Sequence, residues 1–399
     1  MVARERALPK LADHDKCTAC MACLSSCRQG AIKKITGEDG HYYVAVDEER
    51  CVRCGSCERT CPVTNAVGQG CNDLRQTLPL RGWSNDAVYR ERGTSGGIFG
   101  AVAHSFIKNG GVVIGACLRD NECKHIVIDD VDDISLLQGS KYMYSDMTDV
   151  YKSISDYLSD GTKVLFSGVP CQVAGVLAFF RNNKCRHLLH TIDLVCGGMP
   201  SRLLLTAFLR KHPQSIIQSF RTKEKYELIC KEKGVNKSYG SKNLLISGFL
   251  SGLTNRYSCY DCQYACAHHA SDLTLGDYWQ RNKENGSGVS LVLVHSERGK
   301  RLLDSCNVQT EVVEWISFLP YNPKIVVGRI PWRNRWERRL LHKIMSGKCF
   351  YLKNLVYASV YKKYDVIGIA YLAYKKFRSL IEHKRRLRVV KRIISESKL

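Results

Sequence analysis

The stretch CTACMACLSSC, residues 17–27, carries four cysteines separated by two, two and three residues, and CVRCGSCERTC, residues 51–61, repeats that spacing. Three cysteines in the pattern C-x2-C-x2-C on one tight loop supply the ligands of three of the four irons of a [4Fe-4S] cube, so the fourth ligand has to come from elsewhere. Pro62 follows the second stretch and ends its loop. The duplicated spacing therefore predicts two four-iron clusters in one small unit.

In two-cluster bacterial ferredoxins, the fourth ligand of each cluster comes from the other motif. The same exchange here predicts one cluster on Cys17, Cys20, Cys23 and Cys61, and another on Cys51, Cys54, Cys57 and Cys27. Between the repeats, the alternating segment HYYVAVD at residues 41–47 predicts a short strand, as the two-fold ferredoxin unit requires. Arg28 departs from the proline that usually follows the first motif.

A zinc module is the alternative use of these thiols. Its ligands come as two C-x-x-C pairs separated by a longer loop. Such a site would leave half of the eight thiols without a ligand role, and a repeated four-cysteine spacing is much rarer by chance than one C-x-x-C pair. We therefore favour the two-cluster interpretation.

The chain has 20 cysteines in 399 residues, and in a short secreted protein many cysteines would indicate disulfides. Its first residues, MVARERALPKLADHDK, are polar throughout and lack the apolar core of a secretory signal. The nearest candidate for a membrane span, VIGIAYLAY at residues 366–374, is too short to cross a bilayer. We expect a cytoplasmic protein with reduced thiols that does not span the membrane.

After a polar connector at residues 65–82, strand and helix signals alternate. Strands are predicted at residues 110–117, 163–168, 190–196 and 289–296, and helices at residues 97–110, 149–161 and 172–183. This alternation favours an α/β domain. We predict three parts, at residues 1–80, 81–325 and 326–399.

The segment RGTSGGIFGAVAHSF has polar caps and glycines at the start of a predicted helix. Thr94 and Ser95 are good helix caps, and Gly96 and Gly97 allow backbone amides to approach a ligand at the helix N-terminus. A phosphate or a flavin is held in this way. A capped helix start without any ligand has the same signature, so both interpretations stay open.

A second group of cysteines is scattered along the body of the chain. Cys171 and Cys196 follow predicted strands, and in an open parallel sheet the ligand crevice lies outside the carboxyl ends of the strands. The segment SCYDCQYAC adds Cys259, Cys262 and Cys266. Their spacing is compatible with a third metal centre and equally with small buried apolar side chains.

Seven motifs in chain order carry a family resemblance: GTSGGIFGAVA, GSKYMYSDM, VLFSGVPCQVAGV, IDLVCGGMPS, SFRTKEK, SCYDCQYA and SDLTLGDYW. They resemble the motif series of the family of coenzyme F420 hydrogenase/dehydrogenase beta subunits, placed here behind a ferredoxin domain. The resemblance extends over residues 15–300. We accordingly expect an α+β chain in which a bacterial-type 2[4Fe-4S] ferredoxin domain precedes an α/β flavin-binding domain and a basic helical C-terminal tail.

The resemblance implies a bound FAD that exchanges a hydride with a partner and single electrons with iron–sulfur centres. By similarity, the residues that contact FAD would be Thr94, Ser95, Gly96 and Gly97. Lys141 would pair with the flavin phosphate or with the charge of the reduced flavin. A third cluster beside the flavin would be held by Cys171, Cys196, Cys259 and Cys262, with Cys266 as the alternative to Cys171.

Three positions depart from the family pattern and bear on the substrate. Gly197 replaces a usual histidine, His269 replaces a common arginine, and Gln280 replaces the glycine after GDYW. Histidine and arginine pair with anionic or hydrogen-bonding parts of a ligand, so their loss changes which substrate binds. Members of the resembled family that carry a fused ferredoxin domain also include bacterial proteins whose relatives are associated with polysaccharide biosynthesis. F420 is therefore only one of the expected substrates.

The end of the last motif offers further candidates. In one interpretation Asp277 accepts a proton, or a hydrogen bond from a ribityl hydroxyl of the flavin. An acidic residue after Gly276 is, however, more often a turn former. Tyr278 and Trp279 stack on a ring system or, as is more common, pack in the core.

The tail is strongly basic. Residues 331–399 hold 19 Lys and Arg against 4 Asp and Glu, which is +15 of the net charge of +22. Its apolar residues recur at helical spacing: Val366, Ile369, Ala373, Phe377, Leu380 and Ile381. Such a helix lies on an anionic membrane surface, docks an acidic partner, or packs on its own domain with a solvated basic face. We do not expect nucleic-acid binding, because no fold for it is recognisable.

These observations predict an FAD- and 4Fe-4S-dependent oxidoreductase. It would pass electrons between a one-electron carrier such as ferredoxin and FAD, which exchanges a hydride with F420 or another organic substrate. The alternative is a non-catalytic electron-transfer subunit that feeds a partner enzyme. A zinc-dependent interaction protein is a third and weaker interpretation.

Overall fold

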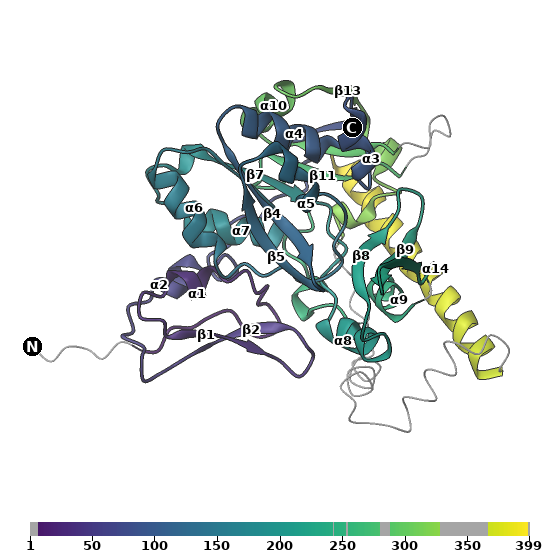
Figure 1. Cartoon of the computed structure of the whole chain (residues 1–399), viewed down its shortest axis with the longest axis horizontal. Helices are drawn as coiled ribbons and strands as arrows, with labels where there is room; N and C mark the ends of the chain where they lie inside the picture. Colours follow the sequence, from purple (N-terminus) through teal and green to yellow (C-terminus); the bar gives the residue numbers. More distant parts are fainter. Residues whose placement is uncertain (1–6, 242, 253, 280–287, 328–365, 398–399) are drawn as a thin grey trace, which may run out of the picture.

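The computed structural model describes residues 7–241, 243–252, 254–279, 288–327 and 366–397. Its largest feature is a mixed sheet at the centre of the body of the protein (Figure 1). The sheet has eight strands in the order β13-β3-β12-β11-β7-β6-β4-β5. The strands are β3 (Leu78–Ser84), β4 (Val112–Arg119), β5 (Glu122–Ile128), β6 (Val164–Gly168), β7 (Leu189–Leu194), β11 (Leu273–Asp277), β12 (Ser290–Val294) and β13 (Val308–Val312). The central run β4-β6-β7-β11 is parallel, and the pairs outside it are antiparallel.

Helices cover both faces of this sheet. The expected helices are confirmed as α4 (Ile98–Lys108), α6 (Val150–Ser159) and α7 (Pro170–Phe179), and the expected strands as β2 (Tyr42–Val46), β4, β6, β7 and β12. Neighbouring strand residues face opposite layers, since Val113 packs with α4 and Ile114 packs with α6 and α7. Smaller helices complete the layers: α3 (Ala87–Arg92), α5 (Ile134–Leu137), α10 (Glu297–Asp304) and α11 (Trp315–Phe318).

The N-terminal region repeats its backbone as well as its cysteines. Each cysteine loop leads into a short helix, α1 (Ala22–Ser26) or α2 (Ser56–Thr60), and a hairpin of β1 (Ile32–Thr36) with β2 lies beneath them (Figure 1). The residues before and after the second cysteine of each loop have positive φ angles: Ala19 at 54° and Met21 at 64°, Arg53 at 54° and Gly55 at 69°. Left-handed residues of this kind are uncommon, so their recurrence shows that the two loops adopt one conformation.

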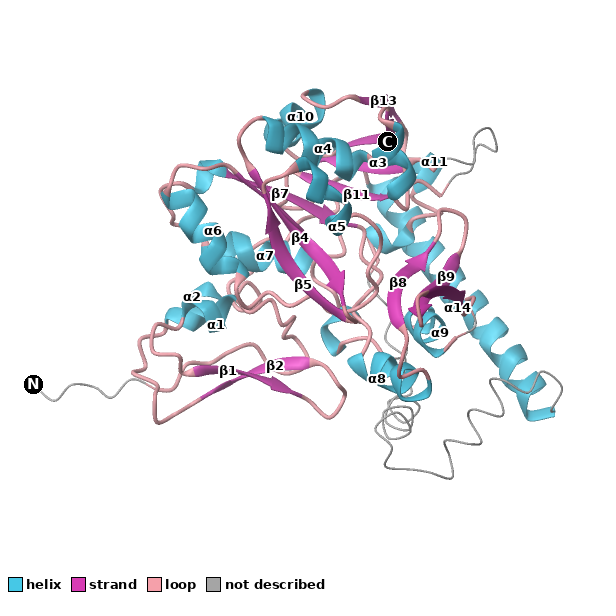
Figure 2. Ribbon diagram, in the orientation of Figure 1, coloured by secondary structure: helices cyan, strands magenta, loops and turns pink. Residues whose placement is uncertain are grey.

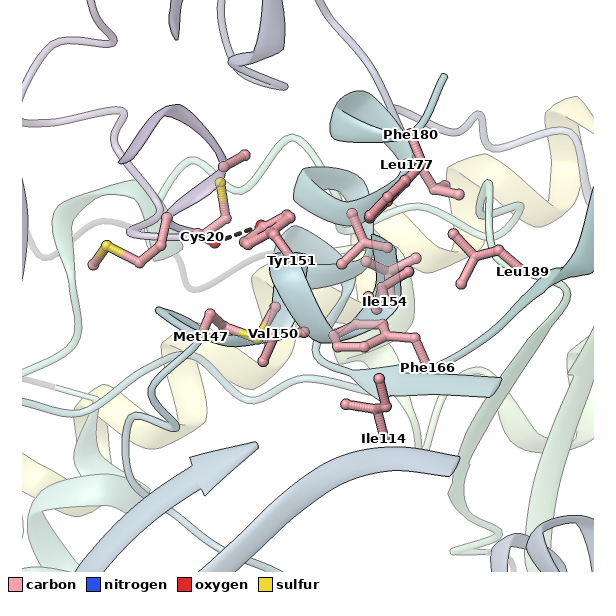
Figure 3. Close-up of a cluster of buried hydrophobic side chains, with 14 of the residues drawn as sticks. Cys20, Ile114, Met147, Val150, Tyr151, Ile154, Phe166, Leu177, Phe180 and Leu189 are labelled. Atoms are coloured by element: carbon pink, nitrogen blue, oxygen red, sulfur yellow. Dashed lines mark hydrogen bonds between the residues drawn. The ribbon is translucent and has the colours of Figure 1, made fainter. Parts of the chain in front are cut away.

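The N-terminal region packs directly on α6 and α7. Met21 is fully buried in the same apolar cluster as Tyr151 of α6 and Val173 of α7. Figure 3 shows Tyr151 of this cluster beside Cys20 of the first cysteine loop. Gly175 lets the two parts approach, because a Cβ at this position would lie 2.7 Å from the Cβ of Cys20. The interface is therefore built around the first cysteine loop.

A second, three-stranded sheet lies beside the main one (Figure 2). It consists of β8 (Ile216–Arg221), β9 (Tyr226–Glu232) and β10 (Val235–Ser238), packed with α8 (Arg202–Lys211) and α9 (Leu244–Ser251). Its three strands are not among those predicted from the sequence.

The chain's C-terminal helix α14 covers Val366–Glu396. Val390 and Ile393 are buried against Trp315 and Phe318, whereas Leu380 is 53% exposed. Residues 328–365 and the side chains of residues 366–379 lie outside the described residues, and so does Gln280. None of the helices in the described ranges has both the length and the apolar character that a membrane span requires.

Candidate functional site

The structure gathers the eight N-terminal cysteines into two sets. Cys17, Cys20, Cys23 and Cys61 line one cavity, and Cys27, Cys51, Cys54 and Cys57 line another. Each set draws its fourth cysteine from the other repeat, which is the grouping expected from the spacing. Their role as cluster ligands stays a prediction.

The two N-terminal sets differ in exposure. The Cys17 set is buried, whereas Cys54 is exposed and Cys51 is half-buried. Cys23 and Cys57 pack in one small apolar cluster with Ile32, so the two sets meet there. The Cys51 set therefore lies at the surface and the Cys17 set lies between it and the body of the protein.

Burial changes the chemistry of these thiols. It raises the pKa of Cys20 to about 12, and the neighbouring Cys17 and Cys61 add to the rise. A thiol with such a pKa stays protonated at neutral pH unless a metal takes the place of the proton. Clustered thiols of this kind are a suitable donor set for iron.

A third cavity collects Cys171, Cys196, Cys259 and Cys262. Cys171 lies in the first turn of α7, just after β6, and Cys196 follows the end of β7. Burial raises the pKa of Cys171, and Cys196, Cys262 and Cys259 add to the rise. The carboxyl ends of two parallel strands thus deliver two of the four thiols, as expected for an open parallel sheet.

Cys266 lies outside this cavity. Its thiol donates to the carbonyl oxygen of His268 at 3.2 Å, and it packs against Gly70. Of the two alternatives left by the sequence, the structure therefore groups Cys171 with Cys196, Cys259 and Cys262.

Every charged side chain among the described residues that line the third cavity is cationic. This cavity has an empty volume of about 890 Å³, including space open to solvent, and its charged side chains are Arg256, His269, Lys324 and Arg386. No carboxylate is among the described residues that line it. The N–H groups of Arg256 Nε and Nη2 and the Nε2 atom of His269 are buried without a hydrogen-bond partner in the described part of the chain. Buried unpaired polar atoms of this kind indicate a missing anionic partner.

A cubane cluster with four thiolates fits this lining. Within the described ranges no group of three or more His, Cys, Asp or Glu side chains is arranged to hold a single metal ion. A [4Fe-4S] cube differs from a single ion, because each of its four sulfur ligands binds a different iron at the corner of a larger core. Its net negative charge would lie beside the unpartnered atoms Nε and Nη2 of Arg256 and Nε2 of His269.

His269 keeps a positive charge at its position. Burial acts to lower the pKa of His269, but the Asp193 carboxylate, 2.8 Å from Nδ1, raises that pKa to about 10. Thr274 holds the same carboxylate with its hydroxyl. The histidine that replaces the family's arginine is therefore an imidazolium at neutral pH.

Gly197 has a structural counterpart in Lys324. A Cβ at Gly197 would lie 3.0 Å from the Lys324 ammonium nitrogen and 3.4 Å from the ring of Phe249. The space beside Gly197 is thus occupied by a cation from the chain's C-terminal half.

A second and larger cavity adjoins the third cysteine set. Its empty volume is about 1450 Å³, including space open to solvent, and it shares Val169, Gln172 and residues 195–199 with the cysteine cavity. It lies at the carboxyl ends of β6, β7 and β11 and reaches the start of α4. This is the position of ligand crevices in open α/β sheets, and its size suits a dinucleotide.

The TSGG turn forms one wall of this cavity. Thr94, Ser95 and Gly97 line it, and Gly97 has a φ of 80° where α4 begins. The Gly96 amide donates to the Ser290 hydroxyl at 2.9 Å, so it is already bonded within the protein. Gly97 is required by the backbone angle and Gly96 by close contact with β3 and β12. Contact of this turn with FAD stays a prediction.

Lys141 also lines the cavity. Its ammonium group donates to the carbonyl oxygens of Leu137 at 2.8 Å and Gln138 at 2.7 Å, at the end of α5. Burial lowers the pKa of Lys141 to about 8. Its pairing with a flavin therefore competes with bonds inside the protein.

Arg221 is a cavity residue that the sequence analysis missed. Its guanidinium pairs with Asp277 at 2.6 Å and donates to the Thr94 carbonyl at 3.2 Å. The motif SFRTKEK contains it, but nothing in that segment shows that a residue 56 positions away is its partner. Asp277 ends β11 and belongs to this pair, Tyr278 packs near Phe318, and Trp279 is 38% exposed.

Comparison with known proteins gives consistent matches along the chain. Residues 16–65 match the 4Fe-4S dicluster domain. Residues 80–152 and 161–315 match the N-terminal and C-terminal parts of the coenzyme F420 hydrogenase/dehydrogenase beta subunit. One of the subunits of the F(420)H(2) dehydrogenase from Methanosarcina mazei is 22% identical over an alignment of 327 residues, and the match covers 77% of this chain and 87% of that protein.

Among solved structures, a chain of the F420-reducing [NiFe] hydrogenase complex from Methanosarcina barkeri is similar. The TM-score is 0.45 and the sequence identity 18%, with 59% of this chain and 82% of that chain covered.

Proposed function

Because this chain belongs to the family of coenzyme F420 hydrogenase/dehydrogenase beta subunits and carries a 4Fe-4S dicluster domain, we propose that it is an iron–sulfur flavoprotein oxidoreductase. It exchanges single electrons with a ferredoxin-like carrier and a hydride with F420 or another organic substrate. Bound [4Fe-4S] clusters supply one-electron transfer, and bound FAD converts single electrons to a hydride.

The observation that carries this proposal is the succession of adjoining cysteine sets. Cys54 of the Cys51 set is exposed, and Cys57 of that set packs with Cys23 of the Cys17 set. Cys20 of the Cys17 set is an electrostatic neighbour of Cys171 in the third set. Cys196 of the third set lines both its own cavity and the large cavity next to it. A line of sites thus runs from the surface to the large cavity.

The roles of the residues follow from their places. The four cysteines of each set are the ligands, and the cations around the third set balance its charge. The large cavity takes FAD, with the TSGG turn and the Arg221–Asp277 pair on its walls. The organic substrate occupies the part of that cavity that stays open to solvent.

The test is to purify the full chain anaerobically and to measure iron, acid-labile sulfide, zinc and extracted flavin. We expect about twelve iron and one FAD per chain, as three cubane clusters and a flavin require. About eight iron without flavin would contradict the proposal and leave an electron carrier. Colourless protein that contains zinc instead of iron would contradict both the oxidoreductase and the electron carrier.

A non-catalytic electron-transfer subunit is the second candidate. The Methanosarcina mazei relative is itself one of the subunits of a dehydrogenase, which favours a partner enzyme for this chain. The two candidates separate when the FAD-loaded chain is assayed alone with reduced ferredoxin and F420. Substrate reduction without any partner supports the enzyme, and reduction only after addition of a second protein supports the carrier. A role in polysaccharide biosynthesis predicts turnover of a sugar substrate in place of F420.

A further inference from the structure

Arg256 lies between two of the cysteine sets. Arg256 is 2% exposed and has the largest fully buried side chain in the described part of the protein. One guanidinium nitrogen, Nη1, donates to the carbonyl oxygen of Cys17 at 3.4 Å, and the guanidinium carbon lies 4.9 Å from the ring centre of Tyr43. The same side chain lines the cavity of the Cys171 set. Arg256 thus contacts the N-terminal region while it faces the third set.

The loop that carries Arg256 is fixed on both sides. Its backbone amide donates to the Met199 carbonyl at 2.9 Å, and the Ser258 hydroxyl donates to the Cys17 carbonyl at 3.2 Å. Cys259 lies three residues further on, and its sulfur accepts a bond from the Met199 amide at 3.3 Å. The position of the guanidinium is therefore coupled to the loops of both sets.

The charge of Arg256 has no counterion in the described part of the chain. No carboxylate forms an ion pair with it there, and its Nε and Nη2 atoms are buried without a hydrogen-bond partner. An arginine does not lose its proton in proteins, and a buried uncompensated charge is strongly unfavourable. Within the described ranges the polypeptide does not balance this charge, and a metal cluster bound by either neighbouring cysteine set would supply the negative charge.

We propose that Arg256 is a positioning residue that balances the negative charge of the iron–sulfur cluster held by the Cys171 set and raises its reduction potential. Reduction adds a negative charge, so a fixed positive charge nearby favours the reduced state. Its contact with the Cys17 carbonyl places the same charge at the junction through which the two sets exchange electrons. This inference rests on the proposed function.

The test is an EPR-monitored redox titration of the anaerobically purified full chain. In Arg256→Met we expect the reduced-to-oxidised ratio of one cluster to fall about tenfold at a fixed ambient potential, which corresponds to about 59 mV for a one-electron couple. Arg256→Lys retains the charge, so the reduction potential of that cluster should lie close to the wild-type value. Arg298→Met is the matched control, because Arg298 lies at the opposite end of β7, beside the Leu189 carbonyl and Asp272, and should leave every potential unchanged.

Unchanged potentials in an iron-replete Arg256→Met variant would overturn the inference, and so would an equal shift in Arg256→Lys. If Arg256→Met loses its iron, Arg256→Gln keeps N–H donors without charge and takes its place. Loss of iron in both neutral variants with retention in Arg256→Lys would support the requirement for charge. Failure of the proposed function is recognised separately, because wild-type protein would then contain no third cluster.

Discussion

Tyr151 of α6 donates its phenol hydrogen to the carbonyl oxygen of Cys20, with 2.6 Å between the two oxygens (Figure 3). A residue from the body of the protein therefore holds the backbone of the first cysteine loop. Tyr144 does the same for the neighbouring Ala19 carbonyl at 3.0 Å. These bonds fix the loop next to α7, whose first turn carries Cys171.

The first prediction concerns this junction. Gly175→Ala should reduce stability and the iron content of the Cys17 set, because the added Cβ would lie 2.7 Å from the Cβ of Cys20 and from the Tyr151 hydroxyl oxygen. Overpacking of this kind costs about 1–3 kcal/mol. Tyr151→Phe removes only one hydrogen bond and should cost about 1 kcal/mol with all iron retained. Denaturant unfolding and iron analysis check both variants, and normal iron content in Gly175→Ala would show that the junction tolerates the shift.

Much of the site was predictable because its signals are local. Cysteine spacing defines a tight loop, so the exchange of Cys27 and Cys61 between the two sets could be inferred before the fold was known. The short buried strands β6 and β7 end just before Cys171 and Cys196, and their apolar runs were visible in the sequence. The family matches confirm the resemblance that the ordered motifs indicated.

The missing parts depend on contacts between distant residues. Arg256 was not selected as a functional residue, because its importance arises from burial beside Cys17, 239 positions away. Arg221 was missed for the same reason. The strands β8, β9 and β10 are short and mixed in polarity, since they form a small sheet with one face packed on α8 and α9. Their pattern does not separate them from loops.

The second prediction distinguishes Cys171 from Cys266 as the fourth ligand of the third cysteine set. Cys171→Ser should lower the iron content by about four per chain, because a cubane needs four thiolates at one site and Cys171 lines that cavity. Cys266→Ser should leave the iron content unchanged, since its thiol is bonded to the His268 carbonyl outside the cavity. Iron and sulfide analysis of anaerobic protein checks the pair. The reverse pattern would identify Cys266 as the ligand.

The third prediction is a pH dependence that comes from His125. This side chain lies between the Ser167 carbonyl at 3.1 Å and the Ser145 hydroxyl at 2.8 Å, and burial lowers the pKa of His125 to about 4. In the unfolded chain the imidazole binds a proton near pH 6.5, so the unfolded state takes up protons first as the pH falls. The free energy of unfolding should therefore decrease from pH 6.5 to pH 4 by about 3 kcal/mol from this residue.

His125→Gln is the matched variant, because glutamine keeps a donor for the Ser167 carbonyl but does not titrate. Its stability relative to wild type should improve by that amount between pH 7 and pH 4. Chemical denaturation at several pH values provides the measurement. Parallel curves for the two proteins would show that His125 is protonated in the folded state as easily as in the unfolded state.

The last prediction concerns the wall of the large cavity. Arg221 is 6% exposed and joins Asp277 at the end of β11 to the Thr94 carbonyl of the TSGG turn. Arg221→Met leaves the Asp277 carboxylate without its partner and frees the turn. Removal of one partner from a buried pair costs about 3–5 kcal/mol, and because Asp277 is 23% exposed we expect the lower part of that range or less. Flavin content should fall with it, since the turn forms a wall of the cavity.

The Arg81–Glu311 pair on the same sheet provides the control for this effect. It joins β3 to β13 with side chains that are 29% and 40% exposed, so Arg81→Met should cost less than about 1 kcal/mol and leave flavin content unchanged. The double variant Arg221→Met with Asp277→Asn should recover part of the stability, because no unpaired charge remains. Denaturant unfolding and the amount of extracted flavin, measured for all three variants, test these expectations. If Arg221→Met binds flavin as wild type does, the pair supports the sheet and has no part in holding the cofactor.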